Sequence, residues 1–551
     1  MTPKSPVAHP TGGEAVVRAL IAHGVRTIYG LPGIQNDWLY NALFDARGEI
    51  RVIHTRHEQG AAYMALGHAL ATGGEAVFNV VPGPGVLNTT AALSTAYALN
   101  ARVFCLAGQI PTAAIGRALG VLHEIPDQLG VLRSLTKWAE RAASVSEAST
   151  LVAEAFRQLR SGRPRPVALE VPMDVLQARG PLGTAAIDLP PVVPPLDEDA
   201  IEAAASLLGT ATRPLIWVGS GAQDASAHVR ALAEALEAPV VSYRTGRGVL
   251  DSRHYLSLVQ PQAHPLWKTA DAVLTIGSHA RVPLQSWGVD DDLRLVRVDV
   301  DPRSHALIKP PAVAITARAE DALPRLLDRL SRHNRSRPSR RDEMAALSAQ
   351  WARDSAFLQP QRAFLDVIRQ ALGEDGIFVD ELTQVGFSAR VVMPVYRPRT
   401  FLSTGYQGTL GYGFQTALGA KAARPNVPVI SVTGDGGFMF GVQELATAVQ
   451  HGLNVVTIVF NNQQYGNVQH MQRELYGGRV IATDLRNPDF VALAHAFGAS
   501  GYRAETPRAL GEAIDRGLAS GLPTVIDVPV GELPDVDRFR KLPRVRGAAR
   551  T

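Results

Sequence analysis

The stretch VPVISVTGDGGFMFGVQELATAVQHGLNVVTIVFNNQQYGN, residues 427–467, holds two apolar β-branched runs with a helical pattern between them. The runs 427–433 and 454–460 have the length and composition of strands that are buried on both faces. Between them, apolar residues recur at helical spacing until Gly452, which we expect to end a helix. This order predicts a strand–helix–strand unit with a right-handed crossover and two parallel strands that are neighbours or near neighbours.

Glycines and polar residues follow directly after both predicted strands. Ligands of doubly wound sheets bind at the carboxyl ends of the strands, so the two groups should face one site. Gly434, Gly436 and Gly437 allow the backbone to turn sharply and to approach a ligand closely. The start of the following helix offers unpaired N–H groups to a phosphate. We therefore expect a ligand with a diphosphate group here.

Asp435 lies among these glycines and would repel a phosphate unless a cation came between them. Mg²⁺ suits this role because it takes octahedral oxygen ligands and bridges carboxylates, amide oxygens and phosphates. Asn462 offers an amide oxygen after the second strand, and Gln464 offers a backbone carbonyl. A plain glycine turn with asparagine turn formers is the alternative, and it is common for either half of the pattern alone.

Three sets of short β-branched runs alternate with helical segments along the 551 residues. This alternation predicts an α/β fold of three tandem doubly wound domains with mainly parallel sheets. We place the first domain at residues 1–180, the central domain at 195–330 and the third at 355–540. The basic segment 329–343 is typical of a solvated linker.

The composition is that of an ordinary globular protein, with 46% hydrophobic and 19% charged residues. The net charge of +4 is small, which argues against nucleic-acid binding. The single cysteine, Cys105, lies in a buried-strand pattern and is expected to be a core residue, as in a reducing compartment. With no apolar run long enough to span a bilayer and no leader pattern at the start, we expect no membrane partner and a cytoplasmic location.

The glycine–aspartate–glycine turn followed by two asparagines resembles the signature of the thiamin-diphosphate enzyme superfamily. The resemblance implies that Asp435, Asn462 and Gln464 bind Mg²⁺ and, through it, the diphosphate of thiamin diphosphate. The segment HTRHEQGAAYMALGHALATG is similar to that of acetolactate synthases. Its glutamate, Glu58, is implied to hydrogen-bond the aminopyrimidine ring of the cofactor as a catalytic residue. A glutamate in the first turn of a helix is the plainer interpretation of Glu58.

Further segments resemble the same family across the whole chain. YGLPGIQN, VPGPGVLN and STGYQGTLGYGFQTALGAKAA are similar to its cofactor loops. In the last of these, Leu410 is implied to lie beneath the thiazolium ring; a plain core leucine is the alternative. The other residues that the resemblance implies for cofactor binding are Gly33, Gly83, Thr383, Gln384, Gly408 and Gly466.

In this family the first domain binds the pyrimidine, the third binds the diphosphate, and the cofactor lies between two subunits. The resemblance therefore implies a homodimer at minimum and favours a homotetramer. The central domain of this family binds FAD in acetolactate synthases and nothing or ADP in other relatives, so the resemblance leaves FAD open here. However, WVGSGAQ matches only part of a dinucleotide turn, and TIGSHARVPLQSWG lacks the segment expected near a flavin.

The sequence departs from acetolactate synthases where the substrate should bind. Gly33 is followed by Ile34, Gln35 and Asn36 in place of a smaller loop, and His123 stands where the family has glutamine. His123 is a candidate acid, base or substrate contact, or else a surface histidine.

We expect a carboligase or lyase that acts on a 2-oxo acid and resembles acetolactate synthase. A non-oxidative decarboxylase of the benzoylformate type is the alternative. The chain has no adjacent pair of histidines, which argues against a site of the pyruvate-decarboxylase kind. A nicotinamide dehydrogenase would explain the sheets but neither Glu58 nor the pairing of Asp435 with Asn462. A silent regulatory subunit would not need these residues intact.

Overall fold

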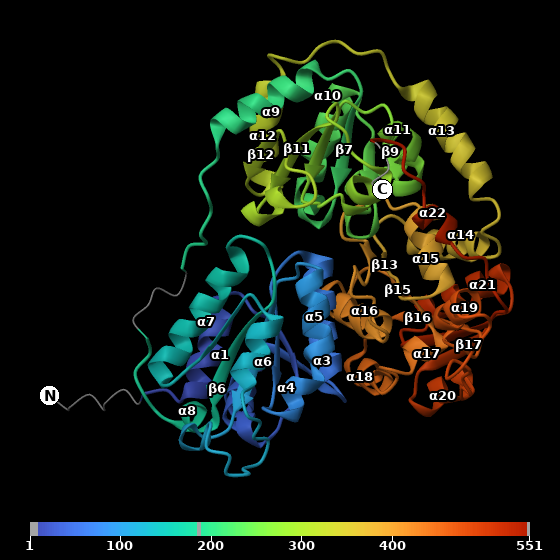
Figure 1. Ribbon diagram of the computed structural model, residues 1–551. Coiled ribbons are helices and arrows are strands. Elements are labelled where there is room, and N and C mark those ends of the chain that lie inside the picture. Colours follow the sequence, from blue (N-terminus) through green and yellow to red (C-terminus); the bar gives the residue numbers. More distant parts are fainter. Residues whose placement is uncertain (1–8, 184–188, 548–551) are drawn as a thin grey trace. The chain divides into compact units, whose positions relative to one another are not determined.

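The computed structural model describes residues 9–183 and 189–547, which form three six-stranded sheets flanked by helices (Figure 1). Every strand pair in these sheets is parallel. The predicted fold class, an α/β fold of three tandem doubly wound domains, is therefore confirmed.

The chain forms two compact units. Residues up to 192, together with 415–425 and 441–453, make the first unit, and the remaining residues make the second. The domain boundaries at 1–180, 195–330 and 355–540 stay a prediction.

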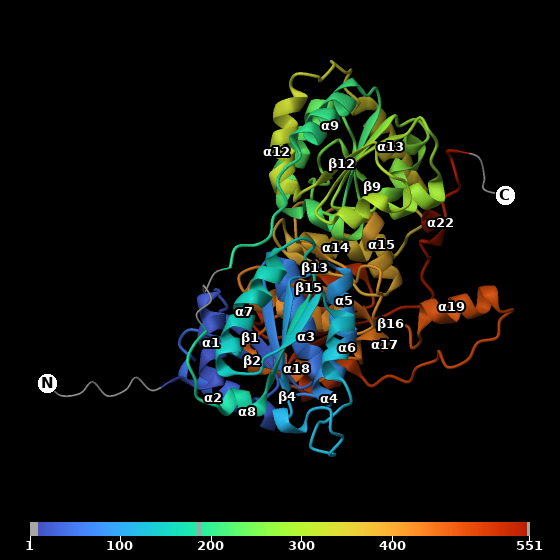
Figure 2. The ribbon, with the colours of Figure 1, turned by 60° about the vertical axis from the view of Figure 1, so that its left-hand side comes forward.

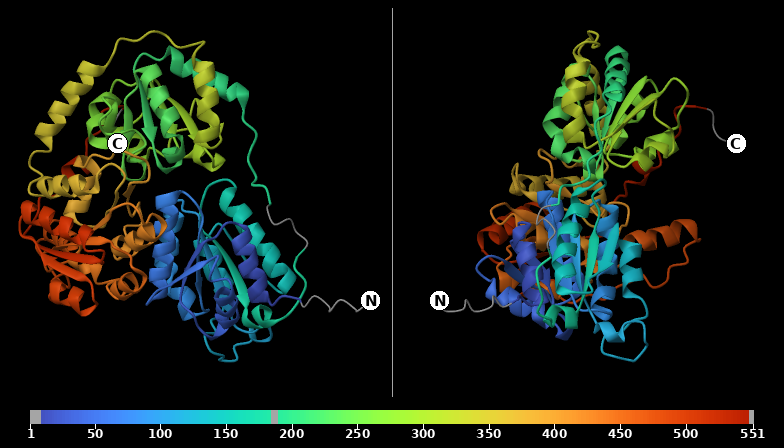
Figure 3. Two further views of the ribbon diagram at one scale, coloured as in Figure 1. Left: turned by 180° about the vertical axis from the view of Figure 1, so that it is seen from behind. Right: turned by 90° about the vertical axis from the view of Figure 1, so that its left-hand side faces the viewer.

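The first sheet has the strand order β2-β1-β3-β4-β6-β5, and Figure 3 shows it from behind and from the side. Its strands are β1 (Thr27–Gly30), β2 (Arg51–His54), β3 (Ala76–Val80), β4 (Val103–Gln109), β5 (Trp138–Arg141) and β6 (Val167–Pro172). The helices around it are α1 (Gly12–Ala22), α2 (Asp37–Asp45), α3 (Glu58–Thr72), α4 (Pro84–Asn88), α5 (Thr90–Ala98), α6 (Gln128–Leu135), α7 (Val145–Arg160) and α8 (Met173–Gln177). Because the strands are parallel, the loops after β1, β2, β3 and β4 meet at one edge.

The second sheet has the order β12-β11-β10-β7-β8-β9. Its strands are β7 (Pro214–Val218), β8 (Val240–Ser242), β9 (Ser257–Val259), β10 (Ala272–Ile276), β11 (Arg294–Asp299) and β12 (Val313–Thr316). The helices are α9 (Glu198–Thr210), α10 (Ser226–Leu236), α11 (His264–Trp267) and α12 (Ala319–Leu330), and α13 (Arg341–Asp354) follows them.

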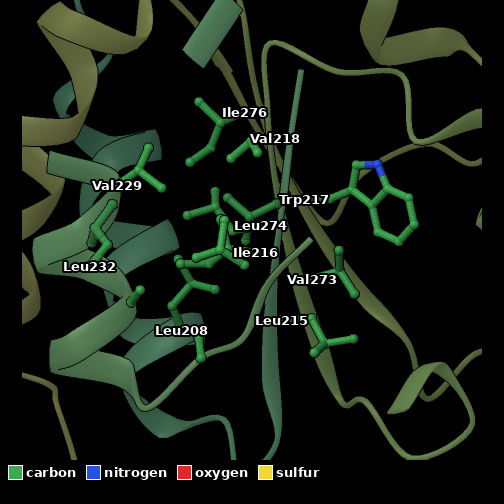
Figure 4. Packing of buried hydrophobic residues seen from close by; sticks show 14 of the residues in the cluster. Leu208, Leu215, Ile216, Trp217, Val218, Val229, Leu232, Val273, Leu274 and Ile276 are labelled. Carbon is green, nitrogen blue, oxygen red and sulfur yellow. The ribbon is translucent and has the colours of Figure 1, made fainter. Parts of the chain in front are cut away.

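Strand β7 shows why these sheets are buried on both faces. Ile216 and Val218 point toward α10, where Val229 packs, whereas Trp217 points to the opposite face (Figure 4). Side chains of a strand alternate between its two faces, so only a continuous apolar run can fill both cores.

The third sheet has the order β14-β13-β15-β16-β18-β17. Its strands are β13 (Ile377–Val379), β14 (Phe401–Leu402), β15 (Val429–Gly434), β16 (Val456–Asn461), β17 (Ser500–Arg503) and β18 (Thr524–Pro529). The helices of this part of the chain are α14 (Gln361–Leu372), α15 (Gln384–Val392), α16 (Tyr412–Ala423), α17 (Asp435–Phe438), α18 (Glu444–His451), α19 (Gly466–Leu475), α20 (Phe490–Ala496), α21 (Pro507–Ala519) and α22 (Asp537–Arg540). Helix α19 extends away from this sheet (Figure 2).

The predicted strand–helix–strand unit is present with one difference. β15 and β16 are parallel neighbours, with Gly434 opposite Phe460, and Gly452 ends the helix in a left-handed conformation. The connection holds two helices, α17 and α18, where the pattern predicted one. The residues between them, 439–443, include a glycine at 441, which favours a break.

The first unit includes α18 and most of α16 because α3 packs closely against residues 415–425. A side chain at Gly67 would overlap the backbone oxygen of Thr416, and one at Gly419 would overlap that of Met64. The two segments are therefore in backbone contact, which the small residues of α3 permit. Cys105 is buried in β4, as expected, and burial raises the pKa of its thiol.

The basic segment 329–343, predicted to be a solvated linker, is in part docked. Arg337 donates hydrogen bonds to the backbone oxygens of Leu208, Gly209 and Ala211 at the end of α9. The last carbonyls of a helix have no partner within it, and a cation satisfies them. Residues 181–199 contain five prolines, which predicts an extended linker, and positions 184–188 of this segment lie outside the described residues. Among the helices of the described residues, none has the length and apolarity needed to cross a membrane.

Candidate active site

Asp435 begins α17 at the carboxyl end of β15 and is 1% exposed. The glycines around it are required by close packing, because a side chain at Gly437 would overlap Oε1 of Glu381 and one at Gly436 would lie 2.5 Å from the ring of Tyr465. The turn therefore holds the Asp435 carboxyl group in a narrow polar space at the sheet edge.

Asn487 is the main hydrogen-bond partner of Asp435. Its Nδ2 donates to Asp435 Oδ2 at 2.7 Å and to Asn461 Oδ1 at 3.2 Å. Burial raises the pKa of Asp435, and the hydrogen bond from Asn487 opposes that rise. Sequence reasoning missed Asn487, whose only local signal is the asparagine–proline pair in RNPDF.

Asn462 and Gln464 lie on the half-buried loop after β16. Because β15 and β16 are neighbours in register, the structure brings both residues to the same edge as Asp435. Gln464 pairs with Asp484 in an isolated antiparallel bridge, and a side chain at Gly466 would lie 2.8 Å from Asn462 Nδ2.

The oxygen donors at this edge fit Mg²⁺. No cluster of three His, Cys, Asp or Glu side chains suited to a metal occurs in residues 9–183 and 189–547. A site here would combine one carboxylate with amide and carbonyl oxygens and with phosphate, which is the usual ligand set of Mg²⁺ in nucleotide and diphosphate sites.

Thr383 and Gln384 lie at the same edge, at the start of α15. Thr383 caps this helix by accepting a hydrogen bond from Gly386 N, and its methyl group lies 3.6 Å from the Cβ position of Gly434. The side-chain oxygens of Gln384, Ser403 and Thr404 are buried, and none has a hydrogen-bond partner among the described residues. Buried polar atoms are normally satisfied, so these unpaired atoms fit a polar ligand at this edge.

Gly408 and Leu410 belong to the loop between β14 and α16. Gly408 has φ +60°, a conformation that favours glycine, and a side chain there would make only ordinary contacts with Leu382. Leu410 is half-buried on this loop, so it is not a fully buried core leucine.

Glu381 is a second residue that the sequence pattern did not reveal. It follows β13, is 1% exposed, and accepts hydrogen bonds from the backbone of Gly411 and Gly413. Burial raises the pKa of Glu381 to about 7, against the lowering effect of these hydrogen bonds.

Glu58 is the first residue of α3 in the other compact unit. Its Oε2 accepts a hydrogen bond from Asn88 Nδ2 at 2.9 Å, and its side chain is 13% exposed. Asn88 ends α4, so this contact places the segment VPGPGVLN beside Glu58. The other carboxylate oxygen of Glu58, Oε1, lies 3.7 Å from the Cβ position of Gly85. Glu58 stands in the first turn of a helix, as its plainer interpretation required, and it is also held in one orientation.

Glu444 of α18 fixes the backbone just before Glu58. Its buried carboxyl group accepts hydrogen bonds from the amides of Arg56 at 3.1 Å and His57 at 3.0 Å, and from Thr447 Oγ1 at 2.5 Å. Burial raises the pKa of Glu444, and these donors oppose the rise. Sequence analysis did not single out Glu444, which lies far from Glu58 in sequence.

Gln35 and His123 form a pair in the loops after β1 and β4. Gln35 is 3% exposed; its Nε2 donates to the backbone oxygen of Leu122 and its Oε1 lies 2.9 Å from His123 Nδ1. Since Oε1 is an acceptor, Nδ1 is the donor in this contact, and Nε2 takes no part in it. His123 has φ +69°, a strained conformation for a residue with a side chain.

Gly33 and Gly83 shape the loops beside this pair. The Gly33 amide donates to Asn36 Oδ1 at 2.8 Å, and a side chain at Gly33 would lie 2.6 Å from Val81. Gly83 has φ +59°, donates its amide to Gln128 Oε1 at 2.7 Å, and leaves no room for a side chain against the backbone of His123. Both positions therefore require glycine.

Three family descriptions match the chain in order. Residues 10–131 match the N-terminal TPP binding domain of thiamine pyrophosphate enzymes, residues 201–326 the central domain, and residues 382–528 the C-terminal TPP binding domain. The protein belongs to the thiamine pyrophosphate enzyme family and is a thiamin-diphosphate-dependent enzyme.

Relatives cover nearly the whole chain. The probable 2-ketoarginine decarboxylase of Pseudomonas aeruginosa is 34% identical over 94% of this chain and 93% of its own. The probable acetolactate synthase large subunit of Methanocaldococcus jannaschii is 32% identical over 95% and 93%. The acetolactate synthase isozyme 1 large subunit of Escherichia coli is 30% identical over 89% and 88%. The chain is thus similar both to synthases and to a decarboxylase.

Proposed function

We propose that the protein is a thiamin-diphosphate- and Mg²⁺-dependent carboligase or lyase that acts on a 2-oxo acid, in the manner of acetolactate synthases. The observation that carries this proposal is the carboxyl group of Glu58, held by Asn88 at the start of α3 with one oxygen left for a ligand. A dehydrogenase would have no use for this carboxyl group, and a silent subunit would not need it oriented.

The residues at the third sheet would bind the diphosphate end of the cofactor. Asp435, Asn462 and the carbonyl of Gln464 would hold Mg²⁺, while Thr383 and Gln384 would contact the diphosphate. Gly408, Gly434, Gly436, Gly437 and Gly466 would let the backbone approach it. Leu410 would support the thiazolium ring from below.

The residues at the first sheet would serve the reacting end. Thiamin diphosphate supplies a carbon nucleophile that stores the electrons released when a 2-oxo acid loses CO₂. Glu58 would exchange a proton with the ring nitrogen of the aminopyrimidine, and its low exposure would keep water from competing. Gly33 and Gly83 would bring their loops close to the cofactor.

Because family members bind the cofactor between subunits, we infer a homodimer at minimum, with a homotetramer favoured. The domains at 1–180, 195–330 and 355–540 would then be the pyrimidine-binding, central and diphosphate-binding domains. Sedimentation velocity measures the assembly, and a monomer with full activity would contradict this inference.

Decarboxylation without condensation is a second candidate function, favoured by the Gln35–His123 pair. Gln35 engages His123 through Nδ1, so Nε2 is the nitrogen that could deliver the proton that ends a simple decarboxylation. The relative from Pseudomonas aeruginosa, named a 2-ketoarginine decarboxylase, supports the same candidate.

One assay separates the two. The purified protein is given Mg²⁺, thiamin diphosphate and a panel of 2-oxo acids that includes pyruvate and 2-ketoarginine, and both CO₂ release and condensation products are measured. Condensation products support the synthase-like activity, whereas CO₂ release with aldehyde alone supports the decarboxylase. Failure to bind thiamin diphosphate in calorimetry would contradict the proposal as a whole.

FAD in the central domain is decided by the absorbance spectrum of the purified protein. The glycine pair of WVGSGAQ has a structural use, since a side chain at Gly219 would overlap the backbone of Gly277 and one at Gly221 would lie 2.8 Å from Gly277 Cα. These glycines let the loops after β7 and β10 pack against each other, so they give no independent support for a flavin.

A further inference from the structure

Glu381 is a buried carboxyl group to which the proposed function assigns no role. Its Oε1 accepts a hydrogen bond from Gly411 N at 2.7 Å. Its Oε2 accepts one from Gly413 N and one from Thr433 Oγ1, both at 2.9 Å. All three donors aim at one carboxyl group, so both of its oxygens are in use.

The three donors belong to two segments that the proposed function places at different parts of the cofactor. Gly411 ends the loop that carries Gly408 and Leu410, and Gly413 lies in the first turn of α16, directly after this loop. Thr433 directly precedes the turn with Asp435, and its hydroxyl group also reaches the backbone oxygen of Gly434 at 3.1 Å. One carboxyl group therefore joins the loop of Leu410 to the turn of Asp435.

The surroundings leave space for this carboxyl group and for little else. Gly411 has φ +80°, which favours glycine. A side chain at Gly413 would lie 2.7 Å from Glu381 Oε2, and one at Gly437 would overlap Oε1. Glycines on both segments thus surround Glu381.

We propose that Glu381 is a positioning residue that fixes the loop of Leu410 against the Asp435 turn. Leu410, proposed to support the thiazolium ring, would then keep a fixed position relative to the residues proposed to bind the diphosphate. This inference rests on the proposed roles of Leu410 and Asp435. Glu381 would not touch the cofactor; it would act through the amides of Gly411 and Gly413.

Replacing Glu381 by glutamine tests this idea with a minimal change of shape. A glutamine has one acceptor oxygen, and its NH₂ group would face a backbone N–H donor. At least one of the Gly411 and Gly413 amides would lose its acceptor. The matched control is Glu170→Gln, because Glu170 is also fully buried and bonded, to Arg141 at 2.7 Å and Gln109 at 3.2 Å, but lies in the first sheet.

The first readout needs neither cofactor nor activity. Hydrogen exchange of the cofactor-free protein at pH 8, where Glu381 is ionised, followed by mass spectrometry of peptides covering residues 403–414, reports the Gly411 and Gly413 amides. We expect exchange in this segment to be at least tenfold faster in Glu381→Gln than in the native protein and unchanged in Glu170→Gln.

The second readout is the dissociation constant of thiamin diphosphate at saturating Mg²⁺, measured by calorimetry well below the unfolding temperature. Glu381→Gln should raise it at least tenfold and lower kcat, with the KM of the 2-oxo acid unchanged. If Glu381 only stabilised the fold, Glu381→Gln would lower the Tm without changing the dissociation constant or kcat.

The outcomes separate this inference from the proposed function. If the native protein does not bind thiamin diphosphate, the proposed function is wrong and the inference falls with it. If the native protein binds and Glu381→Gln shows native exchange and native affinity, only the positioning role is wrong. Should Glu381→Gln fail to fold, Thr433→Val removes a single donor; affinity at least threefold weaker supports the role, and native affinity overturns it.

Discussion

Asn88 Nδ2 donates a hydrogen bond to Glu58 Oε2 over 2.9 Å, and this contact joins the end of α4 to the start of α3. Both residues follow strands of the first sheet whose carboxyl ends share one edge. This bond engages one oxygen of the carboxylate and so limits the directions in which the other oxygen can point. Proton exchange depends on this direction, because proton transfer requires hydrogen-bond geometry.

We expect Glu58→Gln to reduce turnover by at least ~100-fold, the usual effect of removing a general acid or base. Glutamine keeps the shape and still accepts from Asn88, but it cannot exchange a proton. Calorimetry should show thiamin diphosphate binding within a fewfold of the native value. Native turnover in this variant would contradict the proposed role of Glu58.

Asn88→Ala should have a milder effect of the same kind. It removes one hydrogen bond to a carboxylate, worth about 1.5–3 kcal/mol, and so leaves Glu58 free to adopt several rotamers. We expect turnover to fall by roughly tenfold, in line with about 1.4 kcal/mol. The thiamin diphosphate dissociation constant serves as the internal control and should not change.

Asp435→Asn should abolish the Mg²⁺ dependence of cofactor binding. The change removes the only carboxylate proposed for the metal, while the amide oxygen of the new side chain can still accept the hydrogen bond from Asn487. At saturating Mg²⁺, we expect the affinity for thiamin diphosphate to fall by at least ~100-fold, because Mg²⁺ bridges carboxylates to phosphates. In the native protein, EDTA should release the cofactor and added Mg²⁺ should restore it; cofactor binding that resists EDTA would contradict the Mg²⁺ site.

His123→Ala should change the choice of substrate and leave the cofactor in place. Gln35 engages His123 through Nδ1, so Nε2 is the nitrogen proposed to contact the substrate. We expect kcat/KM for the preferred 2-oxo acid to fall by about 10- to 100-fold. Gln35→Ala removes the contact that orients His123 and should also lower kcat/KM. Equal kcat/KM in the native protein, His123→Ala and Gln35→Ala would refute the proposed substrate contact of His123.

The stability of the cofactor-free protein should depend on pH through Glu381. The folded protein holds the Glu381 proton with a pKa of about 7, above the 4.5 of an ordinary glutamate. The folded state therefore binds more protons than the unfolded state between these values, and the stability supplied by the protonated group is lost as pH rises through 7. The difference in Tm between the native protein and Glu381→Gln (native minus variant) should become smaller from pH 5 to pH 8. A difference that does not change with pH would contradict the raised pKa of Glu381.

The sequence pattern predicted what local chemistry determines. The β-branched runs marked the central strands, and the glycines around Asp435 marked a sharp turn that the structure contains. The edge strands β5, β9, β12 and β17 were not recognised. They are short, and β5, β12 and β17 are half-exposed, so they lack the continuous apolar run of a strand buried on both faces.

The hydrogen-bond partners of the site residues could not be predicted from the sequence for a different reason. Asn487, Glu381 and Glu444 each make their contacts across long sequence separations, and a lone asparagine or glutamate has no periodic signature. Their importance follows only from which backbone amides and carboxyl groups the fold brings together. Arg337 is a similar case, because its charge suggested solvent while three helix-end carbonyls bind it.

The backbone contact between Gly67 and Thr416, with the bonds of Glu444 to Arg56 and His57, bears on how this enzyme could be recombined with its relatives. A chimera that exchanges residues 1–180 alone would pair a foreign α3 with native helices from the distant segments 415–425 and 441–453. Any larger residue at position 67 or 419 would then force these backbones apart. A working chimera should therefore take residues 1–180, 415–425 and 441–453 from the same parent protein.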